Sequence, residues 1–280
     1  FNVDQFKNKY MKKLIGLILF ASMLIVSCKK EFIELAPVSS VSVNALYKTD
    51  KDFQDALIGC YTALRSQYNS FWMFGDVASD DSWKEVSRNQ SSYYIDVFTV
   101  DPNDALLKTT WSNYYNVIAR ANNILAKVGA ASDALVTLKT QHIAEAKFLR
   151  ALAYFDLVRI FGGVPMILTP VTVPESYQIG RETAENIYNQ VIIKDLIDTK
   201  NGLPVKNTVS EIGKATKGAA KALLGLVYLT TKDFAKAESK LQELTASPFT
   251  YALLAKYTDL FDYSKDEHHS EYVFDIEYHE

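Results

Sequence analysis

The segment between about Gln141 and Phe161 is apolar on most sides of a helix. Its large apolar residues include Ile143, Phe148, Leu149, Leu152, Phe155, Val158 and Phe161, with alanines between them. A helix without a polar face has to be covered by neighbouring elements on several sides. The segment therefore predicts a helical protein in which other helices surround this one. Gly162 can supply the left-handed residue that ends the helix, and Pro165 prevents the helix from resuming.

Apolar residues at helical spacing predict helices in four other places. The first runs from Thr49 to about Gln67, where Thr49 and Asp52 form a capping-box pattern. The others are expected at 111–129, from Thr183 to near Gly202, and in a hairpin made of 216–230 and 234–246. Residues 68–104 lack a helical period but are rich in aromatic side chains, which argues against disorder. We therefore expect them to form a long structured loop, the kind of segment that often carries function.

The hairpin at 216–246 follows the pattern of a tetratricopeptide repeat. The matching positions are Leu224, Gly225, Tyr228, Ala237 and Pro248. Gly225 and Ala237 would allow two antiparallel helices to approach closely, while Tyr228 fills the gap beside them. Such repeats are stable only in stacks of about three or more helical pairs. The sequence therefore predicts a mostly α fold of tetratricopeptide-repeat-like helical hairpins with long loops.

Apolar and acidic residues alternate near the carboxyl end of the sequence. Phe274, Ile276 and Tyr278 alternate with Asp275 and Glu277, which predicts a short β-strand over 273–278. No partner strand is evident elsewhere in the sequence. We therefore expect residues 49–280 to form a helical-repeat domain that is truncated at its C-terminus.

The amino-terminal region has the pattern of an export signal. Lys12 and Lys13 precede an apolar run from Leu14 to Val26, which is shorter than the ~20 residues needed to span a bilayer stably. Cys28 follows this run, and a cysteine at the cleavage point is typical of a bacterial lipoprotein. The expected divisions are an upstream non-native segment at 1–10, a lipoprotein signal peptide at 11–27 and a tether at 28–48. The alternative is an ordinary exported protein with a chance cysteine.

Charge and cysteine content argue against nucleic-acid binding and against an intramolecular disulfide. The formal net charge is -3, and residues 1–27 hold four lysines and one aspartate, so the remainder carries -6. Nucleic acid is an unfavourable partner because basic residues are interspersed with acidic ones instead of being clustered. If Cys28 is lipidated, Cys60 has no partner for an intramolecular disulfide.

Several motifs occur in an order that resembles the SusD/RagB family of outer-membrane nutrient-binding lipoproteins. They are Trp111-x2-Tyr114-x3-Ile118-x3-Asn122-x2-Leu125, Ala146-Lys147-Phe148-Leu149-Arg150-Ala151-x2-Tyr154-Phe155, Phe161-Gly162-Gly163-Val164-Pro165, Leu203-Pro204 and Thr216-Lys217-x-Ala219-Ala220. The resemblance covers nearly all of the sequence from Cys28 onward, and it corresponds to the amino-terminal half of a typical member. It implies a lipid-anchored protein of the outer membrane, facing the cell surface, that captures glycan or peptide. It also implies a SusC-like TonB-dependent transporter as partner, onto which the helical repeats face.

Candidate ligand-binding residues lie in the long loop. Stacking of a sugar ring on an indole, with carboxylate or amide groups holding its hydroxyls, needs an exposed aromatic residue beside short polar side chains. Trp83 with Asp80, Asp81 and Asn89 fits this description. The resemblance also implies a stacking tryptophan in this region, for which Trp83 is the best counterpart. The alternative is that Trp83 only packs the loop against helices. Trp72 lies within the apolar run from Phe71 to Phe74, and we expect it to belong to the core.

Other chemically suggestive residues have structural explanations. Arg150 lies in the most apolar helix and is expected to form an internal ion pair with a carboxylate, while Trp111, Asn122 and Tyr154 are expected to be scaffold. His268 and His269 are adjacent on a polar segment without a suitably spaced third ligand, so we expect no metal site. No cofactor motif or catalytic motif is present, and we expect a binding protein and not an enzyme.

Three functional classes remain distinguishable by experiment. The favoured hypothesis is a cell-surface lipoprotein that binds glycan and delivers it to a transporter. The first alternative is a helical-repeat adaptor at the outer membrane that binds only protein through its concave face. A glycoside hydrolase is a third possibility, which would require two carboxylates at a defined separation that the sequence does not indicate.

Overall fold

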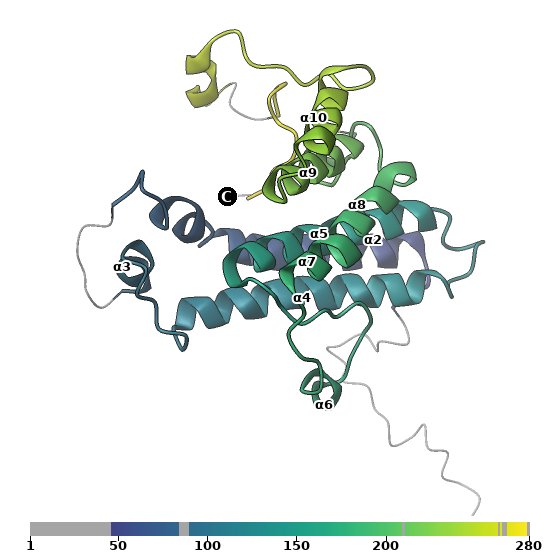
Figure 1. Cartoon of the computed structure of the whole chain (residues 1–280). Helices are drawn as coiled ribbons and strands as arrows, with labels where there is room; N and C mark the ends of the chain where they lie inside the picture. Colours follow the sequence, from purple (N-terminus) through teal and green to yellow (C-terminus); the bar gives the residue numbers. More distant parts are fainter. Residues whose placement is uncertain (1–45, 84–89, 209–210, 263, 265–267, 279–280) are drawn as a thin grey trace, which may run out of the picture. The chain divides into compact units, whose positions relative to one another are not determined.

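A computed structural model describes residues 46–83, 90–208, 211–262, 264 and 268–278. From Tyr47 onward these residues belong to one structural unit, and this part of the chain is mostly helical (Figure 1). The expected signal peptide, Cys28 and nearly all of the expected tether lie outside the described residues. In the part described, no helix is long and apolar enough to cross a membrane.

Helix α2 (Asp50–Tyr68) starts at the capping box that the sequence predicted. The Thr49 hydroxyl accepts a hydrogen bond from the amide of Asp52, and the Asp52 carboxylate accepts one from the amide of Thr49. Two amides that lack partners within the helix are satisfied in this way. The expected bounds of this helix are therefore confirmed to within one residue.

Helix α4 (Ala105–Val128) begins six residues before the expected start at Trp111. Its cap is Asp104, whose carboxylate accepts a hydrogen bond from the amide of Leu106 at 2.8 Å. The first turn is partly exposed and has few apolar residues at helical spacing. The earlier start could therefore not be predicted from periodicity.

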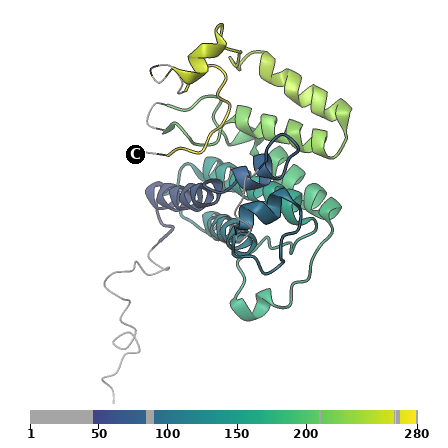
Figure 2. The ribbon, with the colours of Figure 1, turned by 90° about the vertical axis from the view of Figure 1, so that its left-hand side faces the viewer.

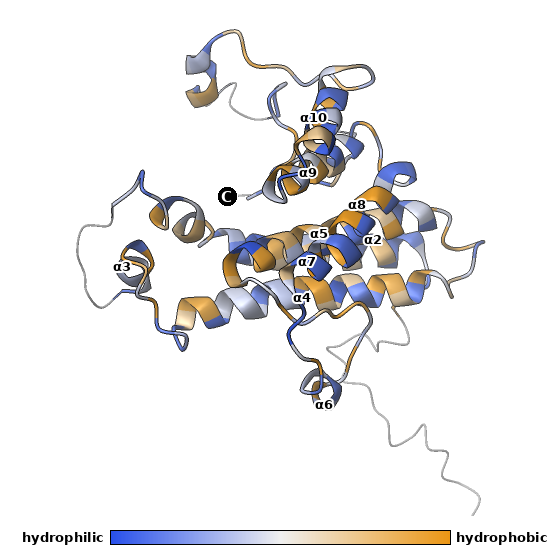
Figure 3. Ribbon diagram, viewed as in Figure 1, coloured by the Kyte–Doolittle hydropathy of each residue, from blue (hydrophilic) through white to orange (hydrophobic). Residues whose placement is uncertain are grey.

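Helix α5 (Lys139–Phe161) is the central element. Fifteen of its residues are buried, and it contacts α2, α4 and α8. The prediction that neighbours cover it on several sides is confirmed, and its apolar residues are seen along the ribbon in Figure 3. The helix ends at Gly162, which has a φ of +70°. Glycine adopts this left-handed backbone conformation without the steric cost that a side chain brings.

The helix expected from Thr183 is present but is not uniform. It consists of α7 (Ala184–Ile187), a π-helical turn η3 (Tyr188–Ile192), α8 (Ile193–Asp198) and a 3₁₀ turn η4 (Thr199–Asn201). The Thr183 hydroxyl caps it by accepting from the amide of Asn186. Buried residues along this stretch face α5, including Ile187, Ile192 and Leu196.

Helices α9 (Lys217–Thr230) and α10 (Phe234–Gln242) form the predicted hairpin, and α9 also contacts α8 and α5. A Cβ atom added to Gly225 would lie 2.6 Å from a methyl carbon of Leu241, so the two helices meet at the glycine as expected. Tyr228 and Ala237 are buried beside this contact. Figure 2 shows the hairpin next to the bundle that contains α2, α4 and α5.

The remaining described elements are short. They are the π-helical turn η2 (Met73–Val77), α3 (Ser91–Asp96), α6 (Val173–Ser176), η6 (Glu243–Thr245) and η7 (Tyr257–Phe261). Two of them, η2 and α3, lie in the segment 68–104 that we expected to be a loop without helix.

The prediction of a β-strand over 273–278 is wrong. In the described residues no strand is formed, and the β pairing found there is an isolated bridge between Pro165 and Arg181. The alternation has another cause, because Phe274 and Ile276 pack against the helical core. The rings of Phe274 and Phe148 meet edge to face at 5.0 Å, and the Tyr278 hydroxyl donates to the carbonyl of Arg65 at 2.7 Å.

Replacing Gly163 by alanine should destabilise the fold by about 1–3 kcal/mol, because the new Cβ would lie 2.2 Å from the rigid backbone oxygen of Glu182. Gly129→Ala is the matched control, since no atom of the described residues lies within 4 Å of its added Cβ. Urea unfolding of both variants measures the difference. Equal free energies of unfolding for the two variants would show that the contact at Gly163 is not tight.

Candidate functional site

Trp83 lies at the protein surface with 76% of its area exposed. Asp80 and Asp81 precede it and are also exposed, while Asn89 lies outside the described residues. The turn that presents them is held by the Ser79 hydroxyl, which donates to the carbonyl of Asp76 and accepts from the amide of Asp81. An exposed indole is therefore presented next to two carboxylates in one short turn, and their role in binding stays a prediction.

The expectation that Trp72 belongs to the core is wrong, because 43% of its area is exposed. The neighbouring Phe71 stacks on Tyr68 at 4.9 Å, and Val77 occupies the buried position at the end of η2. A helical turn directs successive side chains to different sides, so an apolar run cannot bury every member against one surface. Trp72 thus joins Trp83 and Phe98 as an exposed aromatic residue of this segment.

A cavity of about 290 Å³ lies between this aromatic segment and the end of α5. Phe71, Phe74 and Phe98 line it from one side, and Asp156 and Arg159 line it from α5. The sequence analysis did not identify these α5 residues. The available signal was an acid and a base three residues apart in the last two turns of α5, where most of the other residues are apolar.

Asp156 is almost fully buried at this cavity and is held by two phenols. The hydroxyls of Tyr68 and Tyr114 each donate to its Oδ2 atom at 3.0 Å, and the Arg159 guanidinium lies 3.8 Å from its other oxygen. Burial disfavours the charged carboxylate and raises the pKa of Asp156 to about 6. Burial likewise raises the pKa of both tyrosines, which keeps them protonated as donors.

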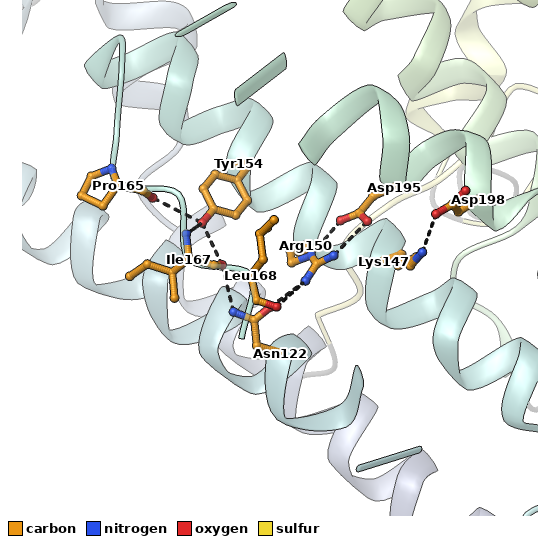
Figure 4. A network of polar contacts seen from close by, with 9 residues as sticks. All are labelled: Asn122, Lys147, Arg150, Tyr154, Pro165, Ile167, Leu168, Asp195 and Asp198. Atoms are coloured by element: carbon orange, nitrogen blue, oxygen red, sulfur yellow. Dashed lines mark hydrogen bonds and ion pairs between the residues drawn. The ribbon is translucent and has the colours of Figure 1, made fainter. Parts of the chain in front are cut away.

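Arg150 forms the internal ion pair that was expected. Its Nε and Nη2 atoms contact the two carboxylate oxygens of Asp195 on α8 at 2.7 and 2.9 Å, as Figure 4 shows. Its Nη1 atom donates to Asn122 Oδ1 on α4 at 2.7 Å and to the carbonyl of Leu168 at 3.2 Å. All five donors of a guanidinium sit in a fixed fork, so these contacts define one orientation of the side chain. Arg150 is a structural residue.

The same network holds the segment that follows α5. Asn122 donates to the carbonyl of Ile167 at 2.9 Å, and the Tyr154 hydroxyl accepts from the Ile167 amide at 2.7 Å (Figure 4). Asn122 and Tyr154 are buried scaffold, as expected. Trp111 is half-buried and packs against Tyr115 and Phe161.

The structure brings His268 close to Asp275 and Glu277, although no third ligand was expected from the spacing. The possible ligand atoms of these three residues lie within 4.8 Å of one another. An ion pair between His268 and Glu277, with a 3.6 Å separation, accounts for part of this proximity without a metal. His269 is not part of the group.

The raised pKa of Asp156 predicts a pH-dependent stability. The folded protein holds this proton up to a pH of about 6, whereas the unfolded chain loses it near pH 4, so the contribution of Asp156 to stability falls as pH rises through that window. The free energy of unfolding of the wild type, minus that of Asp156→Asn, should fall by up to about 3 kcal/mol between pH 4 and 6.5. Urea unfolding at a series of pH values tests this. A difference that is constant with pH would contradict the prediction.

Comparison with known proteins identifies one family. Residues 31–229 match the model of a SusD-like family described as "Starch-binding associating with outer membrane". SusD-like protein P2 of Formosa agariphila is 28% identical over 257 residues, which cover 88% of this chain and 49% of that protein. A SusD-like protein of Bacteroides ovatus is 27% identical, over 92% of this chain and 48% of its own length.

Solved structures show the same relationship. A SusD superfamily protein from Bacteroides vulgatus superposes with a TM-score of 0.74 at 27% identity, covering 82% of this chain and 50% of that one. A laminarin-binding SusD-like protein has a TM-score of 0.73 at 29% identity, covering 81% and 51%. The chain therefore spans about half the length of these relatives. With well over half of its residues matched to the model of this family, the chain belongs to the SusD-like family.

Proposed function

We propose that this protein is a cell-surface glycan-binding lipoprotein that captures oligosaccharide and delivers it to a TonB-dependent outer-membrane transporter. The observation that carries the proposal is the exposed indole of Trp83 beside Asp80 and Asp81, in a chain of a family described as starch-binding. A relative of similar fold is named for laminarin binding, which supports a glycan as the ligand class.

The chemistry of the surface fits a sugar. The apolar CH face of a pyranose ring can stack on the Trp83 indole, and the carboxylates can accept hydrogen bonds from its hydroxyls. The 290 Å³ cavity adds an aromatic group, Phe98, from the same segment of the chain and a charged group, Arg159, from α5. Small-ligand sites combine apolar area with a few polar groups in this manner.

Attachment to the outer membrane would occur through a lipid on Cys28. The family description places its members in association with that membrane. A single acyl chain binds a bilayer only reversibly, but two or more chains hold a protein there firmly. A diacylglyceryl cysteine followed by the 28–48 tether would keep the binding domain at the surface.

The transporter would contact the tetratricopeptide-like hairpin α9–α10. Leu226, Leu229 and Phe234 are exposed on this hairpin. Burying their apolar area against a partner protein is more favourable than leaving it in contact with water. A protein adaptor without its own glycan site would use the same exposed residues. A measurement of glycan binding therefore distinguishes the glycan-binding lipoprotein from the adaptor.

Trp83→Ala should lower the affinity for a bound oligosaccharide by about tenfold or more, because stacking on the indole is lost. Tyr257→Ala is the matched control, since Tyr257 is 74% exposed but lies outside the aromatic loop. Calorimetric titration with laminarihexaose and maltohexaose measures both. Unchanged affinity in Trp83→Ala would remove Trp83 from the site, and no glycan response from the wild type would favour the adaptor.

Cys28→Ser should release the protein from the membrane fraction, because serine cannot receive the thioether-linked lipid. Fractionation of cells that express the wild type or the variant measures this, with Cys60→Ser as the matched cysteine control. If the Cys28→Ser protein stays in membranes after a high-salt wash, the lipid anchor is not the means of attachment.

A further inference from the structure

A second cavity, of about 490 Å³, lies between α4 and the segment that follows α5. Trp111, Tyr115 and Asn123 line it from α4, and Pro165, Ile167 and Tyr177 line it from the other side. Among the described residues, it shares no lining residue with the cavity at Phe98 and Asp156 and includes none of Ser79 to Trp83. Its volume falls within the range of sites that hold small ligands.

The described residues that line this cavity include no Asp, Glu, Lys, Arg or His. They combine three aromatic residues with the uncharged polar side chains of Asn123, Thr169 and Ser176. From the lining residues themselves, a charged ligand would gain no partner of opposite charge to offset its lost hydration. The lining therefore suits a neutral molecule that has both apolar faces and hydroxyl groups.

The part of the cavity wall formed by 165–168 is held by hydrogen bonds from buried side chains of the protein itself. Its backbone is held at Pro165 by the Tyr115 hydroxyl, which donates to the carbonyl at 2.7 Å, and at Ile167 by Asn122 and Tyr154. At Leu168 the carbonyl accepts from Arg150, which is itself held by Asp195. A wall fixed by buried contacts loses little conformational entropy when a ligand binds.

The same contacts disfavour an extended peptide as the ligand. A peptide that adds to an exposed backbone segment needs free amides and carbonyls along that segment. Here the carbonyls of Pro165, Ile167 and Leu168 and the amide of Ile167 are already engaged. Pro165 and Pro170 have no amide hydrogen at all. With these backbone groups engaged, we expect recognition to rely mainly on the lining side chains, which are aromatic rings, hydroxyls and an amide.

We propose that this cavity is a second saccharide site, separate from the Trp83 turn, that takes a neutral sugar ring of an oligosaccharide. Tyr177, with 81% of its area exposed, provides an aromatic face at the mouth of the cavity. Trp111 and Tyr115 form the inner apolar surface. The proposal rests on the proposed function only for the class of ligand, because the cavity and its uncharged lining are independent of Trp83.

The three tryptophans of the chain allow the two sites to be observed separately. Trp111 lies in this cavity, Trp83 lies in the aromatic turn, and Trp72 lies in the same segment as Trp83. Protein labelled with 5-fluorotryptophan gives one fluorine resonance for each, assigned by single Trp→Phe variants. Titrations use laminarihexaose and maltohexaose as neutral probes, trigalacturonate as an anionic probe and a decaproline peptide as a protein-like probe.

The Trp111 resonance should shift in a saturable way with at least one neutral oligosaccharide and not with trigalacturonate or decaproline. Tyr177→Ala should weaken that response about five- to tenfold, as expected for loss of one aromatic contact. Tyr257→Ala should leave it unchanged, and Trp83→Ala should also leave it unchanged because the sites are separate.

Other combinations of the Trp83 and Trp111 responses distinguish a failure of the second site from a failure of the proposed function. A shift at Trp83 with no saturable shift at Trp111 would overturn the second site and leave the proposed function standing. A shift at Trp111 alone would support this site and remove the Trp83 turn from glycan binding. A Trp111 response to decaproline but to neither neutral sugar, or a sugar response unaffected by Tyr177→Ala, would overturn the proposal.

Discussion

One guanidinium group connects the parts of this fold that are far apart in the sequence. Arg150 on α5 contacts Asp195 on α8, Asn122 on α4 and the carbonyl of Leu168. A buried ion pair is weak evidence for stability, since desolvation offsets much of the attraction. The ion pair instead constrains geometry, because the charged guanidinium is tolerated in the core only where all of these partners contact it. The position of the segment after α5, and with it the wall of the 490 Å³ cavity, follows from this requirement.

The aromatic residues divide into two populations with different roles. Tyr114, Tyr154 and Phe155 are buried, and the hydroxyls of the two tyrosines donate hydrogen bonds within the core. Trp83 and Tyr177 are exposed, on separate segments that follow α2 and α5. These exposed rings, and not the buried ones, are the aromatic residues on which the two proposed ligand sites rest.

Sequence patterns predicted the helices well where the signals are local. The capping box at Thr49, the left-handed Gly162 and the close approach at Gly225 each depend on a few neighbouring residues, and each is found as expected. The start of α4 was missed because its cap, Asp104, precedes a turn with little apolar period. For the candidate site, the sequence identified Trp83 and the two aspartates as exposed aromatic and polar groups. It also contained the acid–base pair Asp156 and Arg159, but it gave no sign of either cavity.

By itself the sequence determined the helical class, the central place of α5 and the family, because periodicity, capping residues and motif order are properties of the chain alone. The tertiary structure alone decided that 273–278 is not a strand, since a strand exists only when another backbone pairs with it, and Phe274 instead meets Phe148 in the core. It also decided that Trp72 is exposed and that Asp156 lies beside a cavity. Whether a side chain is buried depends on which residues from distant parts of the sequence pack against it, and a local sequence pattern does not contain that information.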